Sequence, residues 1–273
     1  MQQSPINLER VHSQIRVFVD LDLKRMFMIS HKCGVAIYEH LLSMTYFGKM
    51  NFLQPITEIQ KVGNWLVLIE FDEVDEFLKQ YNETEFSKIM ITRDPYERML
   101  SFYTNSFWDH ATQLHEMKDK IAHYETYQLI YGDRYDEVVE QAKTNDFQKG
   151  FNIFMDSTFV NPTPGALEER QSNNGYGNIH FIPQSSKYRR GDKIVLTDIQ
   201  FIDIRDGIPH GPSTQTILDF LGVEDMMIKR PINISSNTQK NRNKAWQYFS
   251  HEALKIVNEM YHYDFTDFGY SKH

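Results

Sequence analysis

The stretch of residues 91–103, Ile-Thr-Arg-Asp-Pro-Tyr-Glu-Arg-Met-Leu-Ser-Phe-Tyr, constrains the fold most, because it has the pattern of a strand end that turns into a helix. Residues 88–91, which precede the turn, form a short apolar run typical of a buried strand. Asp94 suits the N-cap, Pro95 suits the first helical position, where no amide hydrogen is needed, and Glu97 completes a capping box. The sequence therefore predicts that a helix begins here.

The start of this predicted helix has the features of an anion-binding site. Arg93 lies just outside it, where free backbone amides and the helix dipole favour negative charge. Helical spacing places an apolar stripe on one side and polar residues on the other: Tyr96, Met99, Leu100 and Tyr103 against Glu97, Arg98, Ser101 and Asn105. The Arg93 cation and the Ser101 hydroxyl suit a phosphate. A surface helix whose arginines pair with Glu97 or Asp94 is the alternative.

A second segment upstream has the same strand, loop and helix order. Residues 24–30 form the strand-like run, His31-Lys32-Cys33-Gly34 the loop, and residues 35–42 have helical apolar spacing. Such a turn directs backbone amides at a phosphate, which the lysine can then reach over. The loop lacks the spacing G-x-x-x-x-G-K-[ST], and no hydroxyl residue follows the lysine to hold magnesium, so an ordinary kinase or ATPase is disfavoured.

Together the two segments resemble the sulfotransferases that use 3'-phosphoadenosine-5'-phosphosulfate (PAPS), especially carbohydrate sulfotransferases of the Golgi type and their bacterial relatives. In that family R-D-P-x-x-R-x-x-S-x-Y binds the 3'-phosphate, and this motif matches at every fixed position from Arg93 through Arg98 and Ser101 to Tyr103. The family loop P-K-[TC]-G-[GS]-[TS]-[ST] binds the 5'-phosphosulfate. It matches at Lys32, Cys33 and Gly34.

The phosphosulfate loop departs from the family pattern on both sides of this match. His31 replaces the proline, and the usual hydroxyl residues are replaced by Val35, Ala36 and Ile37. Backbone amides can still cradle the phosphate there, whereas side-chain hydroxyl contacts are lost. The resemblance thus implies that residues 32–37 bind the donor through their backbone and that Arg93 and Ser101 bind its 3'-phosphate.

Further segments extend the resemblance toward residue 270. Residues 180–184, His-Phe-Ile-Pro-Gln, are similar to the family's H-W-x-P-Q, and residues 261–270 are similar to its Y-x-x-D-F-x-x-F-G-Y ending. Lys240 and Arg242 follow a polar stretch, residues 233–236, where the family places a basic loop near the 3'-phosphate. We therefore add both basic residues to the expected donor-binding set.

The pattern along the chain predicts an α/β fold. Residues 64–71 read as another strand and residues 72 to about 81 as a helix, and such alternation favours a central parallel sheet with helices on its faces. The resemblance implies the P-loop-like sulfotransferase form of this class. Ligands of such sheets bind beyond the carboxyl ends of the strands, where both anion loops would lie. Capped helices are expected at 213–221, followed by Gly222, and at 250–261.

We expect one domain over residues 1–273, because no linker rich in Pro, Gly and Ser separates two complete patterns. A long acceptor-region insertion is expected at about 109–179. Its first part, 109–150, is predicted to be mainly helical, and residues 156–179 are predicted to form a long loop. That loop is read either as a lid over the acceptor or as a surface excursion.

Composition narrows the partners and the compartment. A net charge of −8 disfavours nucleic acid and heparan-like acceptors and suits a neutral or cationic small molecule. The first residues have no basic region, no apolar run approaches the roughly 20 residues that span a bilayer, and Cys33 is the single cysteine. We therefore expect a cytoplasmic protein without a membrane partner. The oligomeric state is left open.

Sulfuryl transfer needs charge stabilisation on the leaving oxygen, a base for the acceptor and alignment of the acceptor with sulfur. We assign the first role to Lys32. Family members use a glutamate or histidine as the base, so the resemblance favours Glu70, at the end of a predicted strand, with His180 and then His31 as alternatives. We expect no metal site, because the histidines have no tight ligand spacing.

The sequence thus predicts transfer of a sulfuryl group from PAPS, leaving adenosine 3',5'-bisphosphate (PAP), to a hydroxyl or amine of a small molecule. A carbohydrate acceptor is the alternative within this class. From another class, a nucleotide-binding protein that has lost catalysis on the same scaffold is suggested by the missing hydroxyls after Gly34, although Lys32 is retained.

Overall fold

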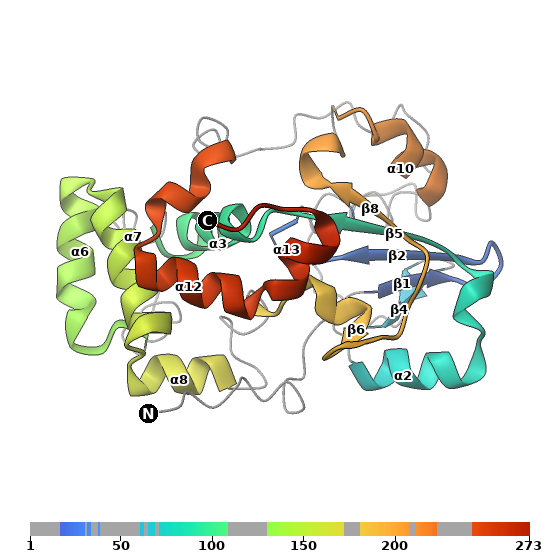
Figure 1. The fold of residues 1–273 in the computed structure, drawn as a ribbon, viewed down its shortest axis with the longest axis horizontal. Coiled ribbons are helices and arrows are strands. Elements are labelled where there is room, and N and C mark those ends of the chain that lie inside the picture. The colour runs from blue at the N-terminus through green and yellow to red at the C-terminus, as the bar shows by residue number, and fades with distance from the viewer. Residues whose placement is uncertain are drawn as a thin grey trace. The chain divides into compact units, whose positions relative to one another are not determined.

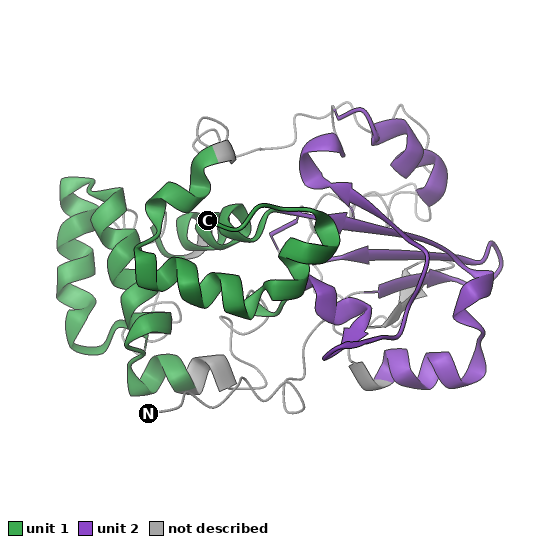
Figure 2. Cartoon of the chain, viewed as in Figure 1, with its two compact units in different colours: residues 1–11, 94–183, 235–273 green, residues 12–93, 184–234 purple. Residues whose placement is uncertain are grey.

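The computed structural model describes residues 17–30, 32–33, 38, 61–62, 65–68, 71–108, 130–171, 181–207, 211–222 and 242–273. The chain divides into two compact units, coloured separately in Figure 2. The sheet unit comprises residues 12–93 and 184–234, and the helical unit comprises residues 1–11, 94–183 and 235–273. The expectation of a single domain with an insertion at about 109–179 stays a prediction.

The described part of the sheet unit contains a six-stranded mixed sheet with the order β3-β4-β1-β2-β5-β8. Its strands are β1 (Val17–Asp20), β2 (Arg25–Ile29), β3 (Lys61–Val62), β4 (Trp65–Leu68), β5 (Ser87–Thr92) and β8 (Ile199–Asp203), and Figure 1 labels all of them except β3. β2, β5 and β8 pair in parallel, as expected, whereas β1 is antiparallel to β2 and β4, and β3 to β4. β6 (Arg189–Arg190) and β7 (Lys193–Ile194) form a separate two-stranded sheet.

The antiparallel pairing of β1 and β2 follows from the tight turn between them. The Asp20 carboxylate accepts hydrogen bonds from the backbone amides of Asp22, at 3.0 Å, and Leu23, at 2.9 Å. A side chain that bonds its own backbone in this way stabilises a short reversal of the chain. Strands joined by so short a turn can pair only antiparallel, because parallel neighbours need a long crossover.

Both faces of the sheet are buried at its central strands β1, β2 and β5. On one face Phe27, Ile29, Ile89 and Ile91 join Ile202 and the apolar side of α10 (Thr214–Leu221) in one cluster. On the other, the alternating residues Val17, Val19, Met26, Met28 and Met90 are also at most 1% exposed. Helices also described in this unit are α2 (Phe71–Gln80) and the 3-10 helices Glu83–Glu85, Gln184–Lys187 and Ile204–Asp206. Such two-sided burial is typical of sheets with parallel strands.

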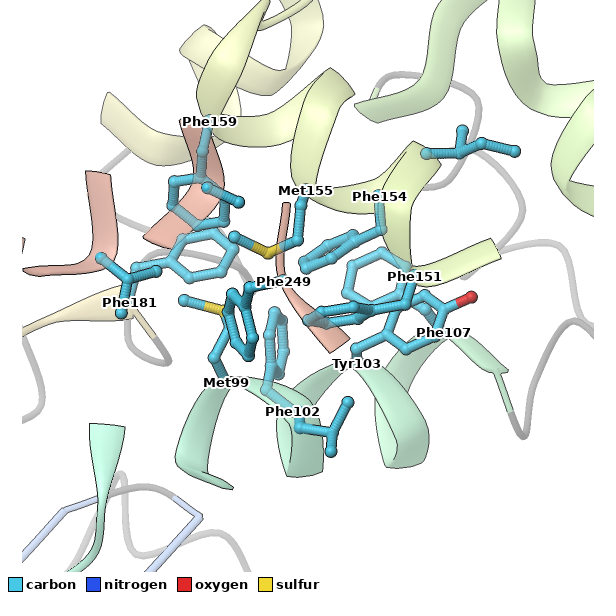
Figure 3. Close-up of a cluster of buried hydrophobic side chains, with 14 of the residues drawn as sticks. Met99, Phe102, Tyr103, Phe107, Phe151, Phe154, Met155, Phe159, Phe181 and Phe249 are labelled. Carbon is cyan, nitrogen blue, oxygen red and sulfur yellow. The ribbon is translucent and has the colours of Figure 1, made fainter. Parts of the chain in front are cut away.

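The helical unit contains α3 (Pro95–Tyr103), α6 (Tyr135–Thr144), α7 (Phe147–Met155), α8 (Pro164–Gln171), α12 (His251–Met260) and α13 (His262–Phe268). Its 3-10 helices are Gly132–Arg134 and Arg242–Tyr248. α3 and α7 each run on into a π-helical turn, Thr104–Trp108 and Asp156–Val160 respectively. Figure 3 shows how aromatic side chains from α3, α7 and these turns meet, with Phe102, Tyr103, Phe151 and Phe154 near the centre.

Most of the predicted elements are confirmed where the structure describes them. β2, β4, β5, α2, α3, α10 and α12 occur where the patterns place them, and α6 and α7 make the described end of residues 109–150 helical. The long loop predicted at 156–179 is wrong for residues 156–171, which form the π-helical turn and α8. Ser157, Thr158 and Phe159 of that turn are each 1% exposed, so this part is packed helix rather than a lid, and residues 172–180 lie outside the description.

Candidate active site

The loop after β2 turns tightly at Lys32. The backbone amide of Cys33 donates a hydrogen bond to the Ser30 carbonyl at 3.0 Å, which closes the turn directly beyond the strand. Lys32 has φ +65, in the left-handed region that a residue with a side chain seldom adopts. Such strain costs on the order of 1 kcal/mol and gathers at functional sites. The turn thus holds a cationic residue in an unusual backbone conformation at the carboxyl end of a strand.

Arg93 follows β5 at the same edge of the sheet. β2 and β5 are parallel neighbours with Ile29 opposite Ile91, so their carboxyl ends lie side by side. The Arg93 guanidinium donates from Nη1 to the carbonyl oxygen of Lys32 at 2.7 Å, and Arg93 is 7% exposed. The structure therefore joins the two predicted anion loops through a direct contact between residues that are 61 positions apart.

Gln184 links both loops from a third segment. Its Oε1 accepts a hydrogen bond from the Arg93 amide at 2.9 Å and one from the Cys33 thiol at 3.1 Å, and its Nε2 donates to the Arg93 carbonyl at 2.7 Å. The residue is 0% exposed. Sequence reasoning placed Gln184 in the His-Phe-Ile-Pro-Gln segment and gave it no role. One signal in the sequence could have identified this role. The motif fixes a glutamine next to Pro183, and a glutamine side-chain amide can donate and accept hydrogen bonds at the same time.

α3 begins at the residue expected. The Asp94 carboxylate accepts hydrogen bonds from the amides of Tyr96, at 2.9 Å, and Glu97, at 3.1 Å, and Pro95 is the first helical residue. The polar side was expected to face away from the apolar stripe, yet Glu97, Arg98 and Ser101 are all at most 5% exposed. α3 is therefore not a surface helix, because its whole circumference is packed.

Two tyrosine contacts fix α3 within the helical unit. The Tyr96 hydroxyl donates to Asn258 Oδ1 of α12 at 2.5 Å and accepts from the amide of His273 at 3.0 Å. Burial raises the pKa of this hydroxyl above its ordinary value, so it remains a neutral donor at physiological pH. The Arg98 guanidinium lies 5.8 Å from the ring centre of Tyr261. These contacts set the position of the helix that carries Ser101.

The sequence-predicted site residues thus fall into three groups. Lys32, Cys33 and Arg93 are brought together in the sheet unit by the contacts above. Ser101 lies in α3 of the helical unit, and Arg242 begins the 3-10 helix Arg242–Tyr248 of the same unit. Outside the described residues lie Gly34, Val35, Ala36, Ile37, Glu70, His180 and Lys240, together with His31.

Within the described part of the chain, no group of three or more His, Cys, Asp or Glu side chains could hold a metal ion. Likewise, none of the helices described is both long and apolar enough to span a bilayer.

Chemically, the edge of the sheet at β2 and β5 carries the ammonium-bearing Lys32 in a tight turn and the buried guanidinium of Arg93. Cations and backbone amides at the carboxyl ends of parallel strands suit an anionic ligand such as a phosphate. Searches of curated proteins and of solved structures found no match to this chain. A family model does match, over residues 23–271, and these residues include both anion loops and the Gln184 segment. With nearly its whole length matched, the chain belongs to the sulfotransferase family.

Proposed function

We propose that the protein transfers a sulfuryl group from PAPS to a hydroxyl or amine of a small-molecule acceptor. The observation that carries the proposal is the hydrogen bond from Arg93 to the Lys32 carbonyl. It unites the two loops to which the motif resemblance assigns the two phosphate groups of the donor. The residues fit such a ligand, because both contribute positive charge and Arg93 is almost fully buried. A guanidinium held in this way is suited to a phosphate dianion.

The proposal assigns donor binding and removal of the acceptor proton to different residues. Arg93, with Ser101, Lys240 and Arg242, binds the 3'-phosphate of the donor. The backbone of residues 32–37 binds its 5'-phosphosulfate. Glu70 removes the acceptor proton, with His180 as the alternative base.

Lys32 acts on the leaving group. The donor supplies an activated sulfuryl group: a bond forms between the acceptor atom and sulfur while the bond from sulfur to the bridging 5'-phosphate oxygen breaks. The electron pair of the broken bond stays on that oxygen, and the Lys32 ammonium neutralises the charge. The acceptor proton passes to the base. No metal ion has a role in this scheme.

The acceptor is proposed to be a small molecule rather than a polyanion, since the chain carries a net charge of −8. A cytoplasmic location is part of the same proposal. Direct transfer from labelled PAPS to a panel of small phenols, alcohols, amines and neutral saccharides, followed by mass spectrometry, tests it. Sulfated product with formation of PAP is the expected result. Binding of PAP without transfer to any acceptor class would instead favour an inactive nucleotide-binding protein.

A further inference from the structure

We propose that Gln184 is a positioning residue that sets the spacing between the Lys32 turn and Arg93, and thereby the protein's discrimination in favour of a 3'-phosphate. The inference rests on the proposed function. It goes beyond that function by assigning the discrimination to a neutral, buried side chain that touches neither phosphate in the scheme above.

The first support is the way Gln184 extends the sheet. Parallel pairing of β5 ends at Ile91 on the β2 side and at Thr92 on the β8 side. Arg93 comes next, buried and beyond both ladders, so its backbone amide and carbonyl need other partners. One side-chain amide supplies both: Gln184 accepts from the Arg93 amide at 2.9 Å and donates to its carbonyl at 2.7 Å. Gln184 therefore takes the place of a further strand residue at this point.

The second support is the link to the other loop. The same Oε1 that accepts from the Arg93 amide also accepts from the Cys33 thiol at 3.1 Å, so one oxygen atom touches both loops. The guanidinium of Arg93 contacts the Lys32 carbonyl in turn. Lys32 and Arg93 are thus held by a closed set of contacts that runs through the Gln184 side chain.

The third support is that any other conformation of the Gln184 side chain would cost free energy. Gln184 is 0% exposed, so a rotation of its amide would leave buried donors and acceptors unpaired. An amide is also neutral. A carboxylate at the same place would compete with a phosphate for the guanidinium, whereas glutamine holds the backbone of Arg93 without drawing on its charge.

The test uses two nucleotides that differ only in the 3'-phosphate, PAP and 5'-AMP. The Kd of each is measured by calorimetry, and the ratio of the 5'-AMP value to the PAP value reports how well the protein reads the 3'-phosphate. Gln184→Met keeps the length of the side chain and removes both hydrogen-bonding groups. We expect the ratio to fall on the order of tenfold, because small displacements of a binding group are costly. Lower stability alone leaves this ratio at the wild-type value, because it reduces the amount of folded protein equally for both nucleotides.

Gln148→Met is the matched control. Gln148 also donates its amide to a backbone carbonyl, that of Tyr248 at 2.8 Å, but it lies in the helical unit. This control is expected to keep the wild-type ratio. Cys33→Ala adds a test of the link: the ratio falls about two- to threefold in the wild-type background and no further in Gln184→Met.

The possible outcomes separate the inference from the function on which it rests. Wild-type protein that does not distinguish PAP from 5'-AMP overturns the proposed function. Wild-type discrimination that persists in Gln184→Met overturns the positioning role alone. Should Gln184→Met not fold, Gln184→Asn, whose amide is one methylene shorter, takes its place: a lowered ratio supports the role, and an unchanged ratio overturns it.

Discussion

The guanidinium of Arg93 is bonded to the carbonyl oxygen of Lys32 at 2.7 Å, across the carboxyl ends of two parallel strands. A guanidinium carries five donors in one plane, a geometry that suits a phosphate and that the single flexible ammonium of a lysine does not reproduce. This relationship leads to the first prediction.

Arg93→Lys should abolish most of the preference for PAP over ATP. Charge is kept, but the planar set of donors is lost, and each charged hydrogen bond contributes roughly 1.5 to 3 kcal/mol. Calorimetry with both nucleotides measures the preference. If Arg93→Lys and Arg93→Ala each bind PAP as selectively as the wild type, the 3'-phosphate is read elsewhere.

Lys32→Ala should lower turnover on the order of a hundredfold or more while changing PAP affinity much less, because the ammonium acts on charge that develops in the transition state. Lys32→Gly is the matched variant. Since Lys32 has φ +65, glycine relieves the backbone strain that alanine keeps, so the two variants should share the turnover loss while glycine gives the more stable protein. Single-turnover kinetics and thermal unfolding measure the two effects. Wild-type turnover in either variant would assign the leaving-group role to another residue.

Glu70→Gln should lower turnover by roughly two to four powers of ten and leave PAP affinity unchanged if Glu70 is the base. His180→Asn gives the same result only if the histidine has that role. Both residues lie outside the described part of the chain, so kinetics must decide between them. Full activity of both variants on the true acceptor would favour an amine that arrives already deprotonated.

Glu83→Gln should destabilise the sheet unit by about 2–4 kcal/mol at pH 7, because it leaves a buried lysine without its counter-charge. Lys88 Nζ lies 2.7 Å from Glu83 Oε2, and its side chain is 0% exposed. Burial acts to raise the pKa of Glu83, but hydrogen bonds from Lys88 and Thr197 and the charge of Lys88 outweigh it, so the pKa lies below its ordinary 4.5. The stabilisation of the folded state by the Glu83–Lys88 ion pair is thus complete above pH 4.5. It is lost as the pH falls through the lowered pKa of Glu83 in the folded protein.

Urea unfolding of wild type and Glu83→Gln at pH 7 and below pH 4.5 measures this loss: the difference between the two proteins should shrink at the lower pH. Glu85→Gln is the control within the same 3-10 helix. Glu85 pairs with Lys24 at 3.6 Å, with side chains 55% and 43% exposed, so its removal should cost no more than about 0.5 kcal/mol. Equal destabilisation by both substitutions would contradict the prediction.

Gly150→Ala should destabilise the helical unit by about 1–3 kcal/mol, although alanine is normally the better helix former. A Cβ at Gly150 would lie 2.5 Å from the Tyr103 hydroxyl and 2.9 Å from the Trp108 ring, both in the packed aromatic core. The Tyr103 hydroxyl is buried and makes no hydrogen bond within the described part of the chain, so Tyr103→Phe should be tolerated. It should also restore part of the stability lost in Gly150→Ala. Additive effects of the two substitutions, measured by urea unfolding, would show that this contact is not responsible.

Short-range sequence patterns correctly predicted the strands and the helix next to the candidate site. The Asp94-Pro95 pair fixed where α3 begins, because its cap needs only residues within one turn. Apolar runs likewise predicted β2 and β5. The same reasoning failed at residues 156–171: two prolines and a glycine at 162–165 suggested a loop, yet Phe159 and Ala166 are 1% exposed in the aromatic core, and this long-range packing stabilises a π-helical turn and α8.

The sequence by itself determined the helix cap and the family, because both depend on residue types at short and fixed spacing. Only the tertiary structure decided that Lys32, Arg93 and Gln184 share one set of hydrogen bonds, because residues 61 and 91 positions apart meet only once the strand order is set. Burial of the polar side of α3 was likewise decided by tertiary packing. A periodic pattern states which face of a helix is apolar, but what covers the opposite face depends on segments that the pattern does not contain.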